Sequence, residues 1–146
     1  MCAIAGEDHG IAALTAGLVD ADELVRSNSA FSLGSLARVH ALPGIAIDAL
    51  LDRLDRQREP DNTDSANMAR STVRECVVQA LLQVASYGQL RVPQRTRFVA
   101  AGLHDPDRYV RGLTVEAIRC DPNAAIPAWL SEVVAYLDFW QYQPRA

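Results

Sequence analysis

Apolar residues recur at helical spacing in three separate stretches of the chain, each opened by a Val-Arg pair. The pairs are Val25-Arg26, Val73-Arg74 and Val110-Arg111. Counted from each valine, apolar residues return at offsets 5, 8 and 11, which share one side of an α-helix. They are Ala30, Leu33 and Leu36 in the first stretch, Val78, Leu81 and Val84 in the second, and Val115 and Ile118 in the third, where Asp121 stands at offset 11. The sequence therefore predicts the same amphipathic helix three times.

A shorter apolar pattern precedes each of these helices, at residues 11–18, 45–54 and 98–103. Its last apolar residue lies seven positions before the valine in the first and third stretches, but nineteen positions before Val73. The additional residues match the polar segment 56–67, which is typical of an inserted loop. Each unit is therefore predicted to be a helix, a turn and a second helix.

The residues around these helices fit the same interpretation. Proline suits the first turn of a helix, and Pro43, Pro93 and Pro127 stand where first helices are expected to start. Aspartates precede the second helices of the first and third units at Asp20 and Asp22 and at Asp105 and Asp107. Their carboxylates can accept hydrogen bonds from the unpaired N–H groups of the helix that follows.

These features resemble the HEAT-repeat family, in particular its phycobilisome-lyase-type repeat, whose units follow L-x-D-x-D-x-x-VR-x-x-A-x-x-AL. The segments "LVDADELVRSNSAFSLGSLA" (18–37) and "LHDPDRYVRGLTVEAI" (103–118) match well, and "VRECVVQALLQVA" (73–85) matches the second half. The resemblance implies an all-α, armadillo-type fold: a short right-handed solenoid of about three helical hairpins. It also implies that Arg26, Arg74 and Arg111 bridge repeats by pairing with turn carboxylates.

The whole chain, 1–146, is predicted to be one domain with repeats at about 10–40, 43–88 and 93–121. A C-terminal helix at 126–140 would cover the last repeat, because the end of a solenoid exposes an apolar face. Its aromatic residues leave two alternatives open: a packed cap, or a docking surface for another subunit.

A binding surface follows from the register. Offsets 2, 6 and 10 point away from the predicted core, and in HEAT solenoids the second helices line the concave side. The predicted partner-binding residues are Ser27, Phe31, Ser35, Glu75, Gln79, Gln83 and Glu116 on this face, with Trp140 and Tyr142 at the C-terminal end. Gly112 and Cys120 share the face. A solvated surface that binds nothing is the alternative.

Composition and motifs argue against several functions. The net charge of −4 gives no general attraction to nucleic acid or to an anionic membrane. The basic cluster Arg91, Arg95, Arg97, Arg108 and Arg111 keeps nucleic-acid binding only as an alternative. Cys2, Cys76 and Cys120 are distant from one another, which favours a reducing compartment over disulfides. The three histidines lack metal-ligand spacing, so no metal, cofactor or catalytic residue is predicted.

We therefore expect a cytoplasmic, non-catalytic protein–protein interaction module, a scaffold or adaptor without a membrane span. The lysine-free, alanine-rich composition is typical of a GC-rich bacterial genome. The partner would be another protein, or a second copy bound through the C-terminal helix. The alternatives are an inhibitor or immunity-type protein that blocks a toxin or enzyme, and a HEAT-like nucleic-acid-binding protein.

Overall fold

A computed structural model describes residues 3–56 and 73–124 of the chain, and these residues form six α-helices and no strand. The helices are α1 (Ala3–Gly17), α2 (Glu23–Ala37), α3 (Gly44–Arg56), α4 (Val73–Ser86), α5 (Val92–Leu103) and α6 (Arg108–Cys120). The prediction of an all-α chain is confirmed. The predicted C-terminal helix 126–140 lies outside the described residues, as does the predicted inserted loop apart from its first residue, Arg56, which ends α3.

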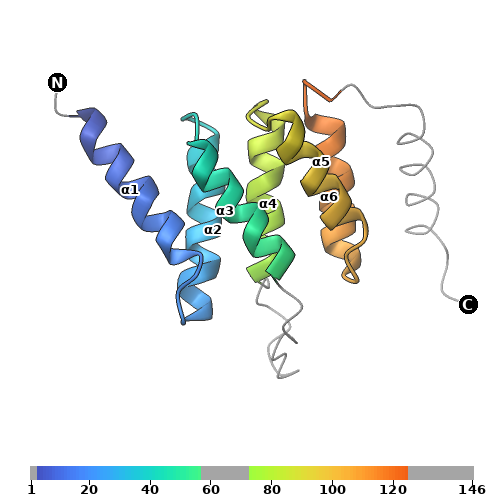
Figure 1. Cartoon of the computed structure of the whole chain (residues 1–146), viewed down its shortest axis with the longest axis horizontal. Helices are drawn as coiled ribbons and strands as arrows, with labels where there is room; N and C mark the ends of the chain where they lie inside the picture. The colour runs from blue at the N-terminus through green and yellow to red at the C-terminus, as the bar shows by residue number, and fades with distance from the viewer. Residues whose placement is uncertain (1–2, 57–72, 125–146) are drawn as a thin grey trace, which may run out of the picture.

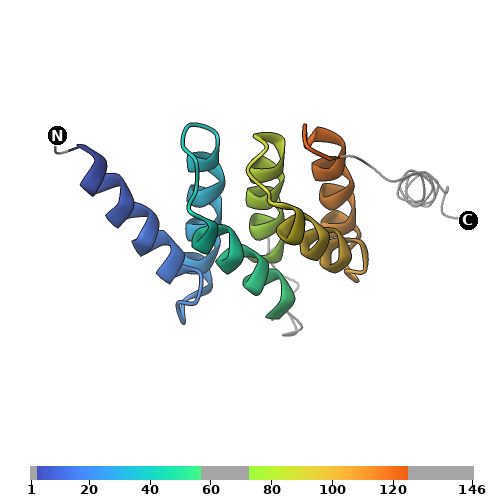
Figure 2. The ribbon, with the colours of Figure 1, turned by 45° about the horizontal axis from the view of Figure 1, so that its top comes forward.

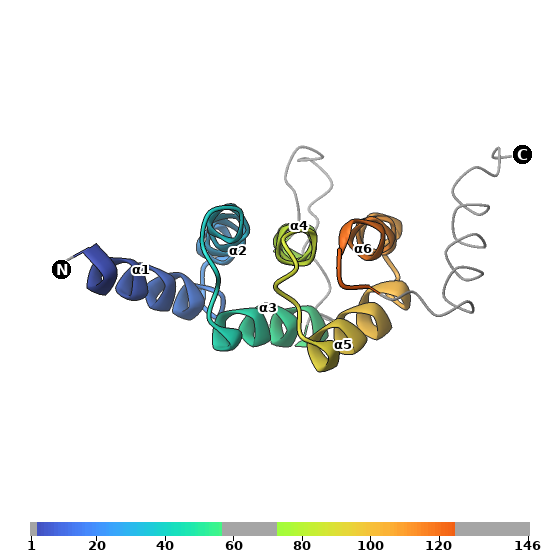
Figure 3. The same ribbon diagram turned by 90° about the horizontal axis from the view of Figure 1, so that it is seen from above.

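The helices form two layers (Figure 1). Seen along their axes, α2, α4 and α6 stand side by side in one row, and α1, α3 and α5 lie across them in the other (Figure 3). We call these rows the second layer and the first layer. The tilted view shows that α2, α4 and α6 run parallel, while the first-layer helices cross them at an angle (Figure 2). Each described helix of the second layer thus packs on its own first helix and on its neighbours in the row.

The helix starts agree with the expected turn chemistry. Asp22 caps α2 by accepting a hydrogen bond from Leu24 N–H at 2.8 Å, and Asp107 caps α6 by accepting one from Tyr109 N–H at the same distance. Pro93 lies in the first turn of α5. Backbone N–H groups there have no partner within the helix, so the N–H that proline lacks costs no hydrogen bond. The sequence thus marks these helix starts correctly.

The core lies between the layers and follows the predicted register. Offsets 5 and 8 from the repeat valine are buried in all three units, and Leu33 and Leu81 are fully enclosed. Asp121, which interrupts the apolar pattern, is also buried, and its carboxylate receives Arg95 Nε at 2.6 Å. An ion pair therefore replaces the apolar contact at that position.

Val25 departs from the register, because its side chain is 39% exposed whereas Val73 and Val110 are 2% and 0% exposed. The reason is its position on α2. A Cβ placed on Gly34 of α2 would lie 2.8 Å from the Cα of Ala80, so offset 7 of α4 faces the preceding unit. Offset 0 shares that side of the helix. On α2 it has no preceding unit to cover it.

The same side of α2 is otherwise polar. Offsets 3 and 7 are Asn28 and Ser32 there, whereas α4 has Cys76 and Ala80, which are both buried. Polar residues at these positions suit a helix whose outer side meets water. In the described structure this side of α2 therefore faces solvent.

Two hairpins are closed by the same close contact between their helices. Gly17 of α1 lies against Ser29 of α2, and Gly102 of α5 lies against Thr114 of α6, with no room for a Cβ at either glycine. Both glycines are eight residues before the repeat valine, and both hydroxyl residues are four residues after it. Offset 4 therefore faces the first layer.

Core truncation tests the register. Replacing Leu81 by Ala should lower the free energy of unfolding by about 2–5 kcal/mol, because the side chain is fully buried and leaves a cavity. Urea titration followed by circular dichroism measures the change. Val19→Ala, at a side chain that is 67% exposed, is the control and should change stability by less than about 0.5 kcal/mol. Equal losses of stability in the two variants would contradict the predicted register of buried residues.

The contact between α2 and α4 gives a second test. Gly34→Ala should destabilise the fold by about 1–3 kcal/mol, because the new methyl group meets the Ala80 backbone. Gly10→Ala on α1 meets no atom within 4 Å and should stabilise the helix by up to about 1 kcal/mol. Thermal melts of the two variants should move in opposite directions; a higher melting temperature for Gly34→Ala would disprove the close approach.

Candidate functional site

The predicted partner-binding residues of α2, α4 and α6 lie on the side of the second layer that faces away from the first layer. Offset 4 contacts the first layer, as the pairs Gly17–Ser29 and Gly102–Thr114 show. At about 100° per residue, offsets 2 and 6 lie about 160° from offset 4, and offset 10, the position of Ser35 and Gln83, lies about 120° from it. We call this surface the outer face of the second layer. It spans three parallel helices.

The seven predicted residues on these helices all reach solvent. Phe31, Ser35, Gln79 and Glu116 are exposed, and Ser27, Glu75 and Gln83 are half-buried. Phe31 is 62% exposed, which is unusual for a side chain of its size. Ser35 donates its hydroxyl to the Phe31 carbonyl at 3.1 Å. Trp140 and Tyr142 lie outside the described residues, so their predicted role stays a prediction.

Two apolar residues of this face do not appear among the predicted ones. Leu24 and Tyr109, at 64% and 59% exposed, both stand one residue before the repeat valine. Leu24 is seven residues from Phe31, which places the two side chains within about 20° of each other around α2. The signal was available in the sequence, because an i, i+7 pair of apolar residues outside the core register marks a second apolar stripe.

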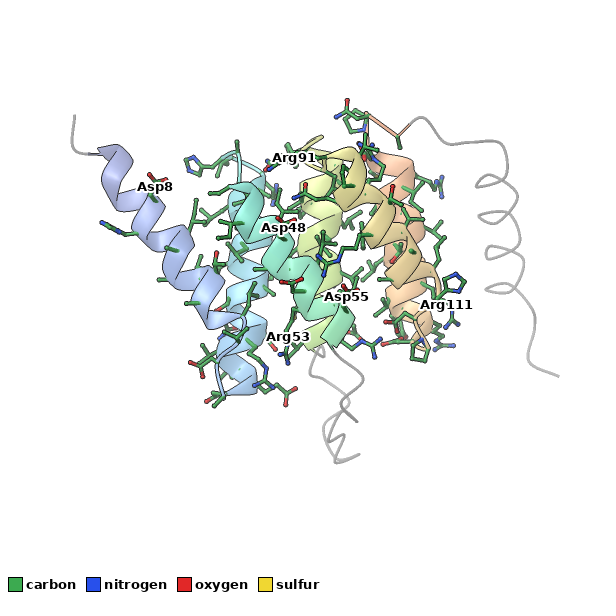
Figure 4. The ribbon with its side chains drawn as sticks, in the orientation of Figure 1. Asp8, Asp48, Arg53, Asp55, Arg91 and Arg111 are labelled. Atoms are coloured by element: carbon green, nitrogen blue, oxygen red, sulfur yellow. The ribbon has the colours of Figure 1, made fainter. Side chains whose placement is uncertain are left out.

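The arginine column is divided between two roles, which partly corrects the implied bridges. Arg26 Nη1 donates to the Asp20 and Ala21 carbonyls at 2.7 and 2.8 Å, within its own turn. Arg111 Nη1 makes the same two bonds, at the same distances, to Asp105 and Pro106 (Figure 4). Both arginines therefore stabilise the turn of their own hairpin, through carbonyl oxygens five and six residues earlier.

Arg74 alone makes the predicted bridge among the described residues. Its Nη2 pairs with Asp105 Oδ2, which joins the second unit to the turn of the third. The side chains are only 13% and 3% exposed. Asp105 Oδ1 meanwhile accepts the Asp107 N–H at 2.8 Å, so one buried carboxylate holds both the bridge and the turn. We therefore assign Arg74 and Asp105 a role in holding the units together rather than in binding a partner.

Most of the predicted basic cluster is committed to internal contacts. Arg95 pairs with Asp121, Arg97 pairs with Asp52 and Asp55 of α3, and Arg111 bonds to its turn. Both partners of Arg97 belong to α3, and Figure 4 labels one of them, Asp55. The hydrogen bonds to these carboxylates raise the pKa of Arg97. The ion pairs leave Arg91 and Arg108 as exposed arginines of that cluster, which weakens the case for nucleic-acid binding.

The two described cysteines are poor nucleophiles. Cys76 is buried, because offset 3 faces the preceding unit. Burial, and then the charge of Glu75, raise the pKa of its thiol. The pKa of Cys120 is raised by desolvation and by Glu116, whose Oε1 accepts its Sγ–H at 3.5 Å. A raised pKa lowers the thiolate fraction at neutral pH.

Within residues 3–56 and 73–124, no group of three or more His, Cys, Asp or Glu side chains could hold a metal ion. No described helix is long and apolar enough to cross a membrane. Comparisons with protein-family models, with curated proteins and with solved structures gave no match to this chain.

The bridge between Arg74 and Asp105 can be tested by a near-isosteric change. Asp105→Asn should reduce the free energy of unfolding by about 3 kcal/mol, because it leaves Arg74 half-buried without an opposite charge. Asp52→Asn removes one carboxylate from exposed Arg97 and should cost less than about 1 kcal/mol. Urea denaturation measures both. Equal losses would show that the Asp105 pair is no more than a surface interaction.

Proposed function

We propose that the chain is a short right-handed solenoid of HEAT-like hairpins, closed at its C-terminal end by the segment 126–140. In this proposal it is a cytoplasmic, non-catalytic protein–protein interaction module. The repeated structural details support it: the first and third hairpins share the Asp-x-Asp turn, the arginine bonds to the turn carbonyls, and the glycine–hydroxyl contact. Structural details that recur at the same offsets in two separate hairpins are typical of a repeat protein.

The observation that carries the proposal is the group of exposed apolar side chains on the outer face of the second layer. Leu24, Phe31 and Tyr109 are each more than half exposed on α2 and α6. Gln79 of α4 lies between these helices and is polar. Large apolar side chains around polar groups are typical of a protein contact surface.

The chemistry of this face favours a polypeptide partner with basic residues. Glu116 of α6 is exposed, and Glu75 of α4 is half-buried on the same face. Phe31 and Leu24 would bury the partner's apolar side chains, while the carboxylates would favour Lys or Arg. A basic toxin or nuclease recovered as the partner would identify the chain as an inhibitor rather than as a scaffold.

Site-specific photocrosslinking in the native host tests the proposal. A photoreactive amino acid in place of Gln79, at the centre of the face, should form a crosslink to one protein partner. The same amino acid in place of Ala100, an exposed residue of α5, is the control and should not crosslink to that partner. Mass spectrometry identifies the product.

The crosslink should depend on the apolar residues around position 79. Leu24→Glu with Phe31→Glu should reduce its yield at least tenfold, whereas Val19→Glu, at an equally exposed apolar residue of the α1–α2 turn, should not. Crosslinks at position 100 alone, or a yield that the double variant leaves unchanged, would contradict a binding role for this face. Loss of the product on nuclease treatment would favour nucleic acid instead.

A further inference from the structure

A second apolar surface lies at the edge where consecutive hairpins are connected. Val39 and Tyr87 are both fourteen residues after their repeat valine, in the loops that follow α2 and α4. Ile45 and Val92 lie at the starts of α3 and α5. All four side chains are between 52% and 75% exposed. We call this surface the loop edge; two consecutive units present it in the same form.

The two loops of this edge are joined into one surface. The Gln89 side chain donates from Nε2 to the Ala37 and His40 carbonyls at 2.7 and 3.0 Å, and its Oε1 accepts the Leu42 N–H at 2.8 Å. Arg91 packs directly over Gly44, beside Ile45. Figure 1 shows both loops at the same end of the layers, and Figure 4 shows Arg91 there (Figures 1 and 4).

The loop edge is basic, although the chain as a whole has a net charge of −4. The segments 38–47 and 86–95 contain no Asp or Glu. Arg38 and Arg91 are exposed and form no ion pair among the described residues, whereas Arg95 is paired with Asp121. The nearest carboxylate on α3, Asp48, accepts a hydrogen bond from Gln94 at 2.8 Å.

We propose that the loop edge binds an acidic amphipathic helix of another protein, independently of the outer face. Neighbouring units of a packed helical layer are about 10 Å apart. Two turns of an α-helix span about 11 Å. Apolar residues at i and i+7 of the partner can therefore contact one apolar pair each: Val39 with Ile45 in the first loop, and Tyr87 with Val92 in the second. Carboxylates beside that stripe face Arg38 and Arg91.

A protein helix suits this edge better than a lipid bilayer. Each basic residue near an anionic membrane contributes only about 1 kcal/mol, and the edge offers two exposed arginines. The net charge of −4 opposes the approach of the whole molecule to anionic lipid. A single helix is small enough to interact with the local charge of the edge alone.

Selection from a displayed library of random 16-residue peptides against the full chain tests the proposal. Enriched peptides should be net acidic, with apolar residues at i, i+3 or i+4, and i+7. Val39→Ser with Tyr87→Ser should weaken their binding at least tenfold, and Arg38→Glu with Arg91→Glu should do the same. Val19→Ser, outside both surfaces, is the matched control and should bind as the wild type does. Circular dichroism checks that each variant stays folded.

Three outcomes would overturn the proposal. The first is a selection in which no net-acidic peptide is enriched. The second is acidic peptides whose binding is unchanged by the loop-edge variants. The third is co-sedimentation of the chain with phosphatidylserine vesicles that the loop-edge variants abolish, which would assign the edge to a membrane. Net-basic peptides whose binding needs Leu24 and Phe31 would concern the outer face and not the loop edge, so the two proposals can fail separately.

Discussion

The buried carboxylate of Asp105 connects the closing of a hairpin to its stacking on the next one. One oxygen accepts the Asp107 N–H, and the other receives the guanidinium of Arg74. A carboxylate at this depth is stable only when its lone pairs are occupied, because burial removes its water. The turn between α5 and α6 therefore has its full set of partners only when α4 stands beside it. The Asp105 side chain therefore stabilises both the turn of its own hairpin and the contact with the neighbouring unit.

Periodicity predicted the helical faces well but could not show which faces lack a neighbour. Offset 0 is buried at Val73 and Val110, where a preceding unit covers it, and half-exposed at Val25, where none does. Cys76, outside the predicted core offsets, is buried for the related reason that a second-layer helix is covered on two sides: by the first layer and by the preceding unit. One sequence pattern describes a helix face, whereas burial depends on every neighbour.

The candidate binding surfaces were predictable to different degrees. The outer-face residues from Ser27 to Glu116 follow from the register alone, and the structure places them at the solvent side. Leu24 and Tyr109 were missed because the offsets were counted only forward from the repeat valine, and both residues stand one position before it. The roles of Arg26 and Arg111 were not predictable from the repeat pattern, because their partners are backbone carbonyls, which every residue carries.

Arg119 limits how this architecture can grow. It stands on α6 at offset 9, where α2 has Gly34, the residue that admits the following helix to backbone contact. Arg119 is instead largely exposed and near Glu116. A helix stacked on α6 as α4 stacks on α2 would have to bury this cation without water. A hairpin inserted after α2 would meet the small side of Gly34, whereas a hairpin added beyond α6 in the same way would meet the long charged side chain of Arg119.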